Sequence, residues 1–151
     1  MLVRDGNGHV VPHQDASLAD EDILIRRVTS VHLQPSDLGK RRISKSSMAG
    51  SSRDRDPYQG MSLDLLRILN EQGIDVTDAA QYHPDIEVLI GLRVGAIREQ
   101  CPELMLGRCP ILNPPNEAHC CAWGVSKEST RKRLLKIATI IRAPADIENP
   151  S

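Results

Sequence analysis

The chain has almost no aromatic residues from which to build a core. Its 151 residues include no Phe, and the only aromatic side chains are those of Tyr58, Tyr82 and Trp123. Aromatic rings supply the largest single contributions to core burial. The core must therefore be assembled from Leu, Ile, Val, Met and Ala. This composition predicts modest stability, or a partner that covers part of the apolar surface.

Length and charge limit the class of protein. A chain of 151 residues has the usual size of one domain. Its formal net charge of −1 gives it no overall attraction to nucleic acid or to an anionic membrane. No apolar run is long enough to span a bilayer, and residues 1–22 lack the basic start and apolar stretch of a secretion signal. We expect a cytoplasmic protein that does not use a membrane, with a protein partner favoured over nucleic acid.

Apolar patterning predicts a mixed α and β fold. Runs rich in β-branched residues indicate strands at 23–28, 86–94 and 119–124. A helix is predicted over 127–141, with one face formed by Thr130, Leu134, Ile137, Ala138 and Ile141. For residues 61–73 two alternatives stay open, a strand followed by a helix and a helix alone. The other expected elements are a turn at 35–39, an exposed extended segment at 40–48, and helical turns at 76–82 and 95–100. The predicted class is α+β, a small mixed sheet of about four strands with a C-terminal amphipathic helix packed on it.

The same patterning predicts one domain with loose ends. Residues 1–22 are expected to form a flexible N-terminal arm, and residues 144–151 a C-terminal tail. Between them lies a single α+β domain, 23–143. Its stretch 49–60 has few apolar residues to pack, so we expect a mobile loop there.

The four cysteines are expected to be buried thiols that bind no metal. A reducing cytoplasm keeps thiols free, and Cys120 and Cys121 point to opposite faces of a strand, so they cannot pair with each other. Structural zinc sites take ligands in close pairs, whereas Cys101 and Cys109 are eight positions apart and His119 adjoins Cys120. We therefore expect no metal and no cofactor. At the start of an apolar strand, His119 is interpreted as a structural residue.

Basic and hydroxyl side chains form a candidate anion site. Guanidinium forks and hydroxyls are the groups that recognise phosphate or carboxylate. A strand over 40–48 would divide these groups between two faces, so a solvated edge strand and a partner contact remain the alternatives. The consecutive arginines Arg26 and Arg27 also interrupt the first strand. The candidate anion-binding residues are Arg26, Arg41, Arg42, Ser44, Ser46 and His119.

The C-terminal helix carries the strongest charge asymmetry in the chain. Its cations are opposed by a single acid, Glu128. A solvated helix face is the common meaning of such a pattern, and docking against an acidic partner is the functional alternative. The candidate partner-binding residues are Arg131, Lys132, Arg133 and Lys136.

Several short motifs resemble those of a group of short, uncharacterised bacterial proteins. The motifs are the arginine-bearing strand 25–28, the segment Arg42–Met48, the strand 61–64 and the stretch 114–124 with Ala118-His119. The chain departs from the group at Met48, where an aromatic residue is usual, and in having Ala before His119 instead of after it. The resemblance implies the order of these elements and assigns no catalytic residue.

Two functions from different classes follow. The sequence lacks a nucleophile elbow, a phosphate-binding glycine loop and an H-E-x-x-H motif, which favours a non-enzymatic binding or accessory module acting with a partner protein. The alternative is a small enzyme for a nucleotide-like or phosphorylated substrate, whose cleft would be lined by Arg26 or Arg27, Arg42, Ser44, Ser46 and His119. An arginine on a first strand before a serine-bearing strand is similar to ADP-ribosyltransferase-type folds. That likeness implies a catalytic glutamate, for which Glu87 and Glu117 qualify by position only.

Overall fold

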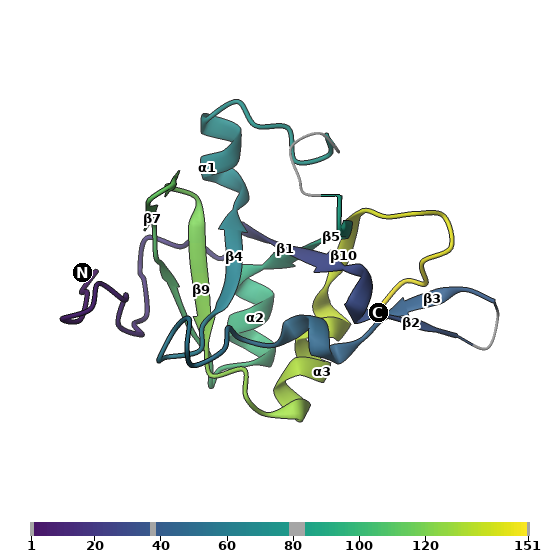
Figure 1. Cartoon of the computed structure of the whole chain (residues 1–151), viewed down its shortest axis with the longest axis horizontal. Helices are drawn as coiled ribbons and strands as arrows, with labels where there is room; N and C mark the ends of the chain where they lie inside the picture. Colours follow the sequence, from purple (N-terminus) through teal and green to yellow (C-terminus); the bar gives the residue numbers. More distant parts are fainter. Residues whose placement is uncertain (1, 37–38, 79–83, 151) are drawn as a thin grey trace.

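A six-stranded antiparallel sheet organises the molecule (Figure 1). The computed structural model describes residues 2–36, 39–78 and 84–150. The strand order is β10-β5-β1-β4-β9-β6, and every neighbouring pair is antiparallel. The strands of this sheet are β1 (Ile23–Thr29), β4 (Met61–Leu65), β5 (Ile86–Arg93), β6 (Met105–Arg108), β9 (His119–Trp123) and β10 (Thr139–Arg142).

Short elements surround this sheet. Two small hairpins pair β2 (Leu33–Pro35) with β3 (Arg41–Ile43), and β7 (Ile111–Leu112) with β8 (Pro115–Asn116). The helices are α1 (Leu66–Glu71), α2 (Val94–Gln100) and α3 (Glu128–Ile137), with 3-10 turns η1 (Ser30–His32) and η2 (Lys45–Met48). None of the helices in the described ranges is long and apolar enough to cross a membrane.

One face of the sheet carries the main core. The inward side chains of the strands are aliphatic or sulfur-containing, as the shortage of aromatic residues requires. Met48 of η2, Ile97 of α2 and Leu134 of α3 belong to the same buried cluster, and α2 and α3 lie on the same side of the sheet (Figure 1). We call this the core face.

The opposite face, here called the second face, is covered in two separate parts. Leu69 of α1 packs there against Ile25 and Leu89. At the other end, Val10 of the N-terminal segment packs against a cluster that contains Cys121 and Trp123. The middle of the second face is left to polar side chains, which makes it the natural place to look for a site.

The structure confirms several predicted elements. Strands occupy 23–29, 86–93 and 119–123, a helix occupies 94–100, and the alternatives at 61–73 resolve into strand β4 followed by helix α1. The mixed α and β class is also observed. The expected sheet of about four strands is wrong, because the sheet has six.

The predicted helix over 127–141 is too long. α3 ends at Ile137, and Thr139–Arg142 forms edge strand β10 against β5. The reason is local, because Thr139, Ile140 and Ile141 are β-branched and pack better on a pleated sheet than in a helix.

The segment 40–48 is only partly extended. After β3, the Ser44 hydroxyl accepts a hydrogen bond from the Ser46 backbone N–H and caps η2. Met48 and Ser47 are buried rather than exposed. Of the helix expected at 76–82, residues 79–82 lie outside the described ranges, and Val76 and Thr77 lie in a turn. The turn expected at 35–39 includes residues 37–38, which also lie outside them.

The N-terminal segment packs against the sheet. Leu18 is 1% exposed and belongs to the main core. The Asp22 carboxylate accepts hydrogen bonds from the Ala19 backbone N–H and from the Arg67 guanidinium, which lowers the pKa of Asp22. The segment therefore forms part of the folded unit, while the mobility expected for 1–22 and for loop 49–60 stays a prediction.

The two faces of α3 should respond differently to substitution. Leu134 is fully buried, so Leu134→Ala should lower the free energy of unfolding by about 2–5 kcal/mol through the cavity that it leaves. Lys136 is exposed, so Lys136→Glu should change it by about 0.5 kcal/mol or less. Urea denaturation followed by circular dichroism measures both. A Lys136→Glu variant less stable than Leu134→Ala would show that the two faces are assigned the wrong way round.

Candidate functional site

The first predicted anion ligand, Arg26, donates hydrogen bonds to backbone carbonyls inside the protein. Its guanidinium donates to the carbonyls of Ser47 at 2.9 Å, Ser62 at 2.8 Å and Ala49 at 3.2 Å. Burial lowers the pKa of Arg26 to about 10, so the group still carries its charge at neutral pH. Arg26 thus ties three backbone segments together, with each of its three nitrogens donating to a backbone carbonyl.

The other predicted residues lie in separate places. Arg41 donates to Asp146 at 2.7 and 3.1 Å and to Glu87 at 3.2 Å, and these carboxylates raise its pKa, with Asp146 the larger cause. Arg42 is exposed on β3. The Ser46 hydroxyl lies 2.9 Å from His32 Nδ1 and also contacts the Ser44 hydroxyl. Burial, followed by the charge of Arg26, lowers the pKa of His32.

The full cleft expected from Arg26 or Arg27, Arg42, Ser44, Ser46 and His119 is therefore not formed. Of the six predicted anion-binding residues, His119 lines a pocket of about 570 Å³, and Arg26 lies with it at a smaller cavity of about 80 Å³. The two glutamates named by position are also elsewhere. Glu87 pairs with Arg41, and Glu117 lies 3.7 Å from Arg108. If the chain is an enzyme, its site must combine His119 with residues other than the ones expected.

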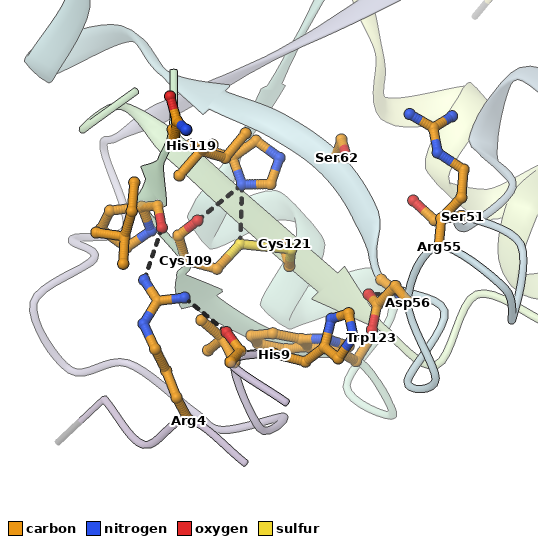
Figure 2. Close-up of a pocket in the computed structure, with 17 residues that line it drawn as sticks. Arg4, His9, Ser51, Arg55, Asp56, Ser62, Cys109, His119, Cys121 and Trp123 are labelled. Atoms are coloured by element: carbon orange, nitrogen blue, oxygen red, sulfur yellow. Dashed lines mark hydrogen bonds between the residues drawn. A yellow bond between two sulfur atoms is a disulfide. The ribbon is translucent and has the colours of Figure 1, made fainter. Parts of the chain in front are cut away.

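A cavity of about 570 Å³ lies over the second face, beside β9 (Figure 2). The N-terminal segment, the loop 51–60 and the chain leading into β7 form its walls. The lining side chains that bear on chemistry are Arg4, Arg55, Ser62, Cys121, His119 and Trp123. A smaller cavity of about 80 Å³ shares Ser62 and His119 with it and adds Arg26, Arg27 and Asp64.

His119 is held in one orientation. Its Nδ1 lies 2.8 Å from the Cys109 carbonyl oxygen, which can only accept a hydrogen bond. The proton of the neutral ring therefore sits on Nδ1, and Nε2 keeps its lone pair. A histidine arranged in this way can accept a proton from a group in the pocket.

An ion pair between buried Asp64 and exposed Arg27 adjoins His119. Asp64, 4% exposed, is the register partner of His119 across β4 and β9. Its carboxylate pairs with the Arg27 guanidinium and accepts a hydrogen bond from Asn116 Nδ2 at 3.1 Å. Because a buried carboxylate is costly without such partners, this pair fixes the polar floor beside the histidine.

Cationic side chains outweigh acidic ones in the larger pocket. Arg4 donates to the carbonyls of Gly8 at 2.9 Å and Pro110 at 2.8 Å, and to no carboxylate within the described residues. Arg55 is exposed at the same pocket. The lining carboxylate, Asp56, accepts hydrogen bonds from the backbone N–H groups of Tyr58 and Gly60, each at 2.9 Å. The pocket is therefore suited to an anion.

Trp123 forms part of the wall. It is 2% exposed, and its ring centroid lies 5.3 Å from that of His13. A Cβ atom at Gly60 would come within 2.9 Å of Trp123 Nε1, so only glycine lets the loop approach the indole so closely. Within the described part of the chain, Nε1–H finds no hydrogen-bond acceptor. The indole N–H is thus a spare donor in the wall of the pocket.

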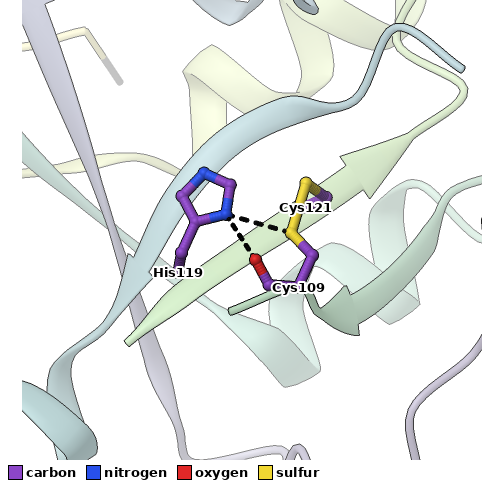
Figure 3. Close-up of side chains that lie close together, drawn as sticks. All are labelled: Cys109, His119 and Cys121. Atoms are coloured by element: carbon purple, nitrogen blue, oxygen red, sulfur yellow. Dashed lines mark hydrogen bonds between the residues drawn. A yellow bond between two sulfur atoms is a disulfide. The ribbon is translucent and has the colours of Figure 1, made fainter. Parts of the chain in front are cut away.

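Two of the cysteines correct the expectation of free thiols. Cys109 and Cys121 form a disulfide across β6 and β9, with Cα atoms 6.1 Å apart (Figure 3). Cys101 and Cys120 are free and buried, and burial raises the pKa of Cys120 to about 12. The inference that neighbouring Cys120 and Cys121 cannot pair is correct. The partner of Cys121 comes instead from the adjacent strand.

Sequence reasoning missed most of the pocket. Ser62 and Asp64 alternate with the buried Met61, Leu63 and Leu65, so the polar members of this strand marked the second face. Cys121 is two positions from His119, which places both on one face of β9. Arg4 and Arg55 belong to irregular segments, and no local pattern marked them.

No family model matches this chain, and no curated protein or solved structure matches it either. The resemblance to short bacterial proteins therefore stays an expectation. Any function must be inferred from the pocket and its side chains.

The disulfide can be tested by alkylation. When the protein is unfolded with iodoacetamide and no reductant, we expect modification of Cys101 and Cys120 only, because Cys109 and Cys121 are bonded to each other. Prior reduction should make all four cysteines reactive. Peptide mass spectrometry distinguishes the two patterns. Full modification of Cys109 in the unreduced protein would contradict the disulfide.

Proposed function

We propose that the chain is a small enzyme that binds a phosphorylated or nucleotide-like molecule in the pocket beside β9. One observation carries the proposal. His119, with Nε2 left as a proton acceptor, shares a pocket with the cations Arg4 and Arg55. The proposed ligand is the same nucleotide-like or phosphorylated molecule as in the enzyme alternative of the sequence analysis. Of the residues named there, His119 is the one that lines this pocket.

The charge of the pocket supports an anionic ligand. Guanidinium groups recognise phosphate through paired N–H donors, and the contacts of Arg4 with neutral carbonyls leave its charge uncompensated. Arg55 brings a second positive charge from the opposite wall (Figure 2).

The floor of the pocket supports proton transfer. His119 Nε2 can take a proton from a ligand hydroxyl or from water, and return it later in the reaction. The Ser62 hydroxyl lines both cavities and can hold that group in place.

A binding experiment with a matched pair of arginine variants tests the pocket. Arg53 and Arg55 are both exposed on one loop, but only Arg55 lines the pocket. We expect Arg55→Gln to weaken binding of ADP and of inorganic pyrophosphate by roughly tenfold, the loss of one charge-assisted contact. Arg53→Gln should bind like the wild type. Isothermal titration calorimetry on the unreduced protein measures both.

Turnover is read from the same samples. Phosphorus NMR should show slow hydrolysis of ADP to AMP and inorganic phosphate by the wild type, with His119 taking a proton from the attacking water. His119→Gln should show no hydrolysis and keep its affinity for the probe. Equal weakening by Arg53→Gln and Arg55→Gln would reject the pocket as the binding site. Conversion that persists in His119→Gln would reject the role of the histidine.

An accessory role with a protein partner is retained as a second proposal, together with a cytoplasmic location. It is supported by the exposure of Lys127, Lys132 and Lys136 at α3, whose packing through Leu134 would leave these lysines outward. Arg131 and Arg133 contribute less, because Arg131 donates to the Val125 and Ser126 carbonyls and Arg133 to the Gln100 carbonyl and Glu103.

Charge reversal tests that surface. A variant with Lys127→Glu, Lys132→Glu and Lys136→Glu should lose a protein that the wild type captures from the native host. Capture by the wild type should also weaken with salt, since exposed charges are screened over about 8–10 Å at physiological ionic strength. Lys40→Glu with Arg42→Glu provides a control at exposed cations on another part of the surface. Identical protein sets from the triple variant and the wild type would argue against the surface.

A further inference from the structure

We propose that, once the disulfide is reduced, Cys109, Cys121 and His119 form a binding site for a zinc-class divalent cation. Their ligand atoms already lie within 4.8 Å of one another. His119 Nδ1 is 3.1 Å from Cys109 Sγ (Figure 3). This site replaces the sequence expectation that the chain binds no metal, and it does not depend on the proposed function.

The backbone brings the three ligands together without a sequence motif. His119 and Cys121 project from the same face of β9, two positions apart, and Cys109 follows the end of the paired strand β6. Short zinc bonds of about 2.3 Å to sulfur and 2.0–2.1 Å to nitrogen place tetrahedral donor atoms roughly 3.5–3.8 Å apart. Small shifts of side chains already in contact therefore suffice.

The donor set and its surroundings suit a soft cation with an open position. Two thiolates and an imidazole prefer zinc to calcium or magnesium, and such a set with a free fourth position is typical of a catalytic rather than a structural centre. Cys109 and Cys121 are only 5% and 7% exposed, so the thiolates would be largely shielded from water. The fourth position would face the cavity that all three residues line.

The chemistry balances without further groups. A phosphine reductant breaks the S–S bond, giving its two electrons to the sulfurs and taking an oxygen from water, whose two protons complete the thiols. Metal binding then displaces these two thiol protons to solvent. For Nδ1 to bind the metal, its hydrogen bond to the Cys109 carbonyl must break and its proton must move to Nε2. Reduced, metal-loaded protein would thus present an Nε2–H donor to the pocket in place of the acceptor.

Cobalt titration of the full chain tests the site. The protein is reduced with a phosphine under argon and titrated with Co²⁺. We expect about one Co²⁺ per chain, with a thiolate-to-cobalt charge-transfer band and the ligand-field bands of tetrahedral geometry. Zn²⁺ should displace the cobalt. Glutathione disulfide, which takes up the two electrons as it oxidises the pair, should release the metal and restore the disulfide.

Adjacent cysteines provide the matched control. Cys121→Ser and His119→Gln should lose the charge-transfer band or weaken binding at least tenfold. Cys120→Ser should retain it, because Cys120 points into the core face. Circular dichroism verifies the fold of each variant. If Cys121→Ser does not fold, the result for His119→Gln alone decides the test. Reduced wild type without the band, or equal loss in Cys120→Ser and His119→Gln, would overturn the metal site. ADP binding is measured on the unreduced protein, so the two proposals can fail separately.

Discussion

The buried guanidinium of Arg26 holds together the parts of the chain that surround the pocket. Its three acceptors are backbone carbonyls of Ser47, Ala49 and Ser62, so one side chain on β1 joins η2, the start of the following loop and β4. Hydrogen bonds from a charged donor are among the stronger ones in a protein interior. The loop that Arg26 anchors at Ala49 goes on to supply Arg55 and Gly60 to the pocket wall. A lysine could not replace it, because all three of its donors are on one nitrogen, whereas these carbonyls lie beside three different nitrogens of the guanidinium.

The local sequence pattern was sufficient to predict the elements whose secondary structure does not depend on a neighbouring strand. Ile23–Thr29 and Ile86–Arg93 are rich in β-branched or large aliphatic residues and form strands as expected. The end of α3 was not predictable in this way, because the spacing of Leu134, Ala138 and Ile141 fits a helix as well as it fits a helix followed by a strand. The unpaired edge of β5 decides the outcome by offering Thr139–Arg142 a partner. Such a long-range effect leaves no local signal.

The site was harder to predict than the fold because its residues come from distant segments. The expected cluster at Arg41, Arg42, Ser44 and Ser46 is close in sequence, yet the structure engages Arg41 with Asp146 and Glu87 and Ser46 with His32. The pocket that does form takes Arg4, Arg55 and His119 from three parts of the chain. Sequence proximity favoured the wrong group, since side chains next to one another in a strand point to opposite faces.

Because side chains alternate between the two faces of a strand, the two members of each pair of identical neighbouring residues have different roles. At Arg26-Arg27, the first arginine turns to backbone carbonyls and the second pairs with Asp64 on the second face. At Cys120-Cys121, the first thiol is buried in the main core and the second joins Cys109 beside His119. In each pair, the residue that faces the core has a neutral or apolar environment and no group to react with. The residue on the second face meets charged or reactive partners. Chemistry in this chain is therefore to be sought on the face of the sheet that α2 and α3 leave uncovered.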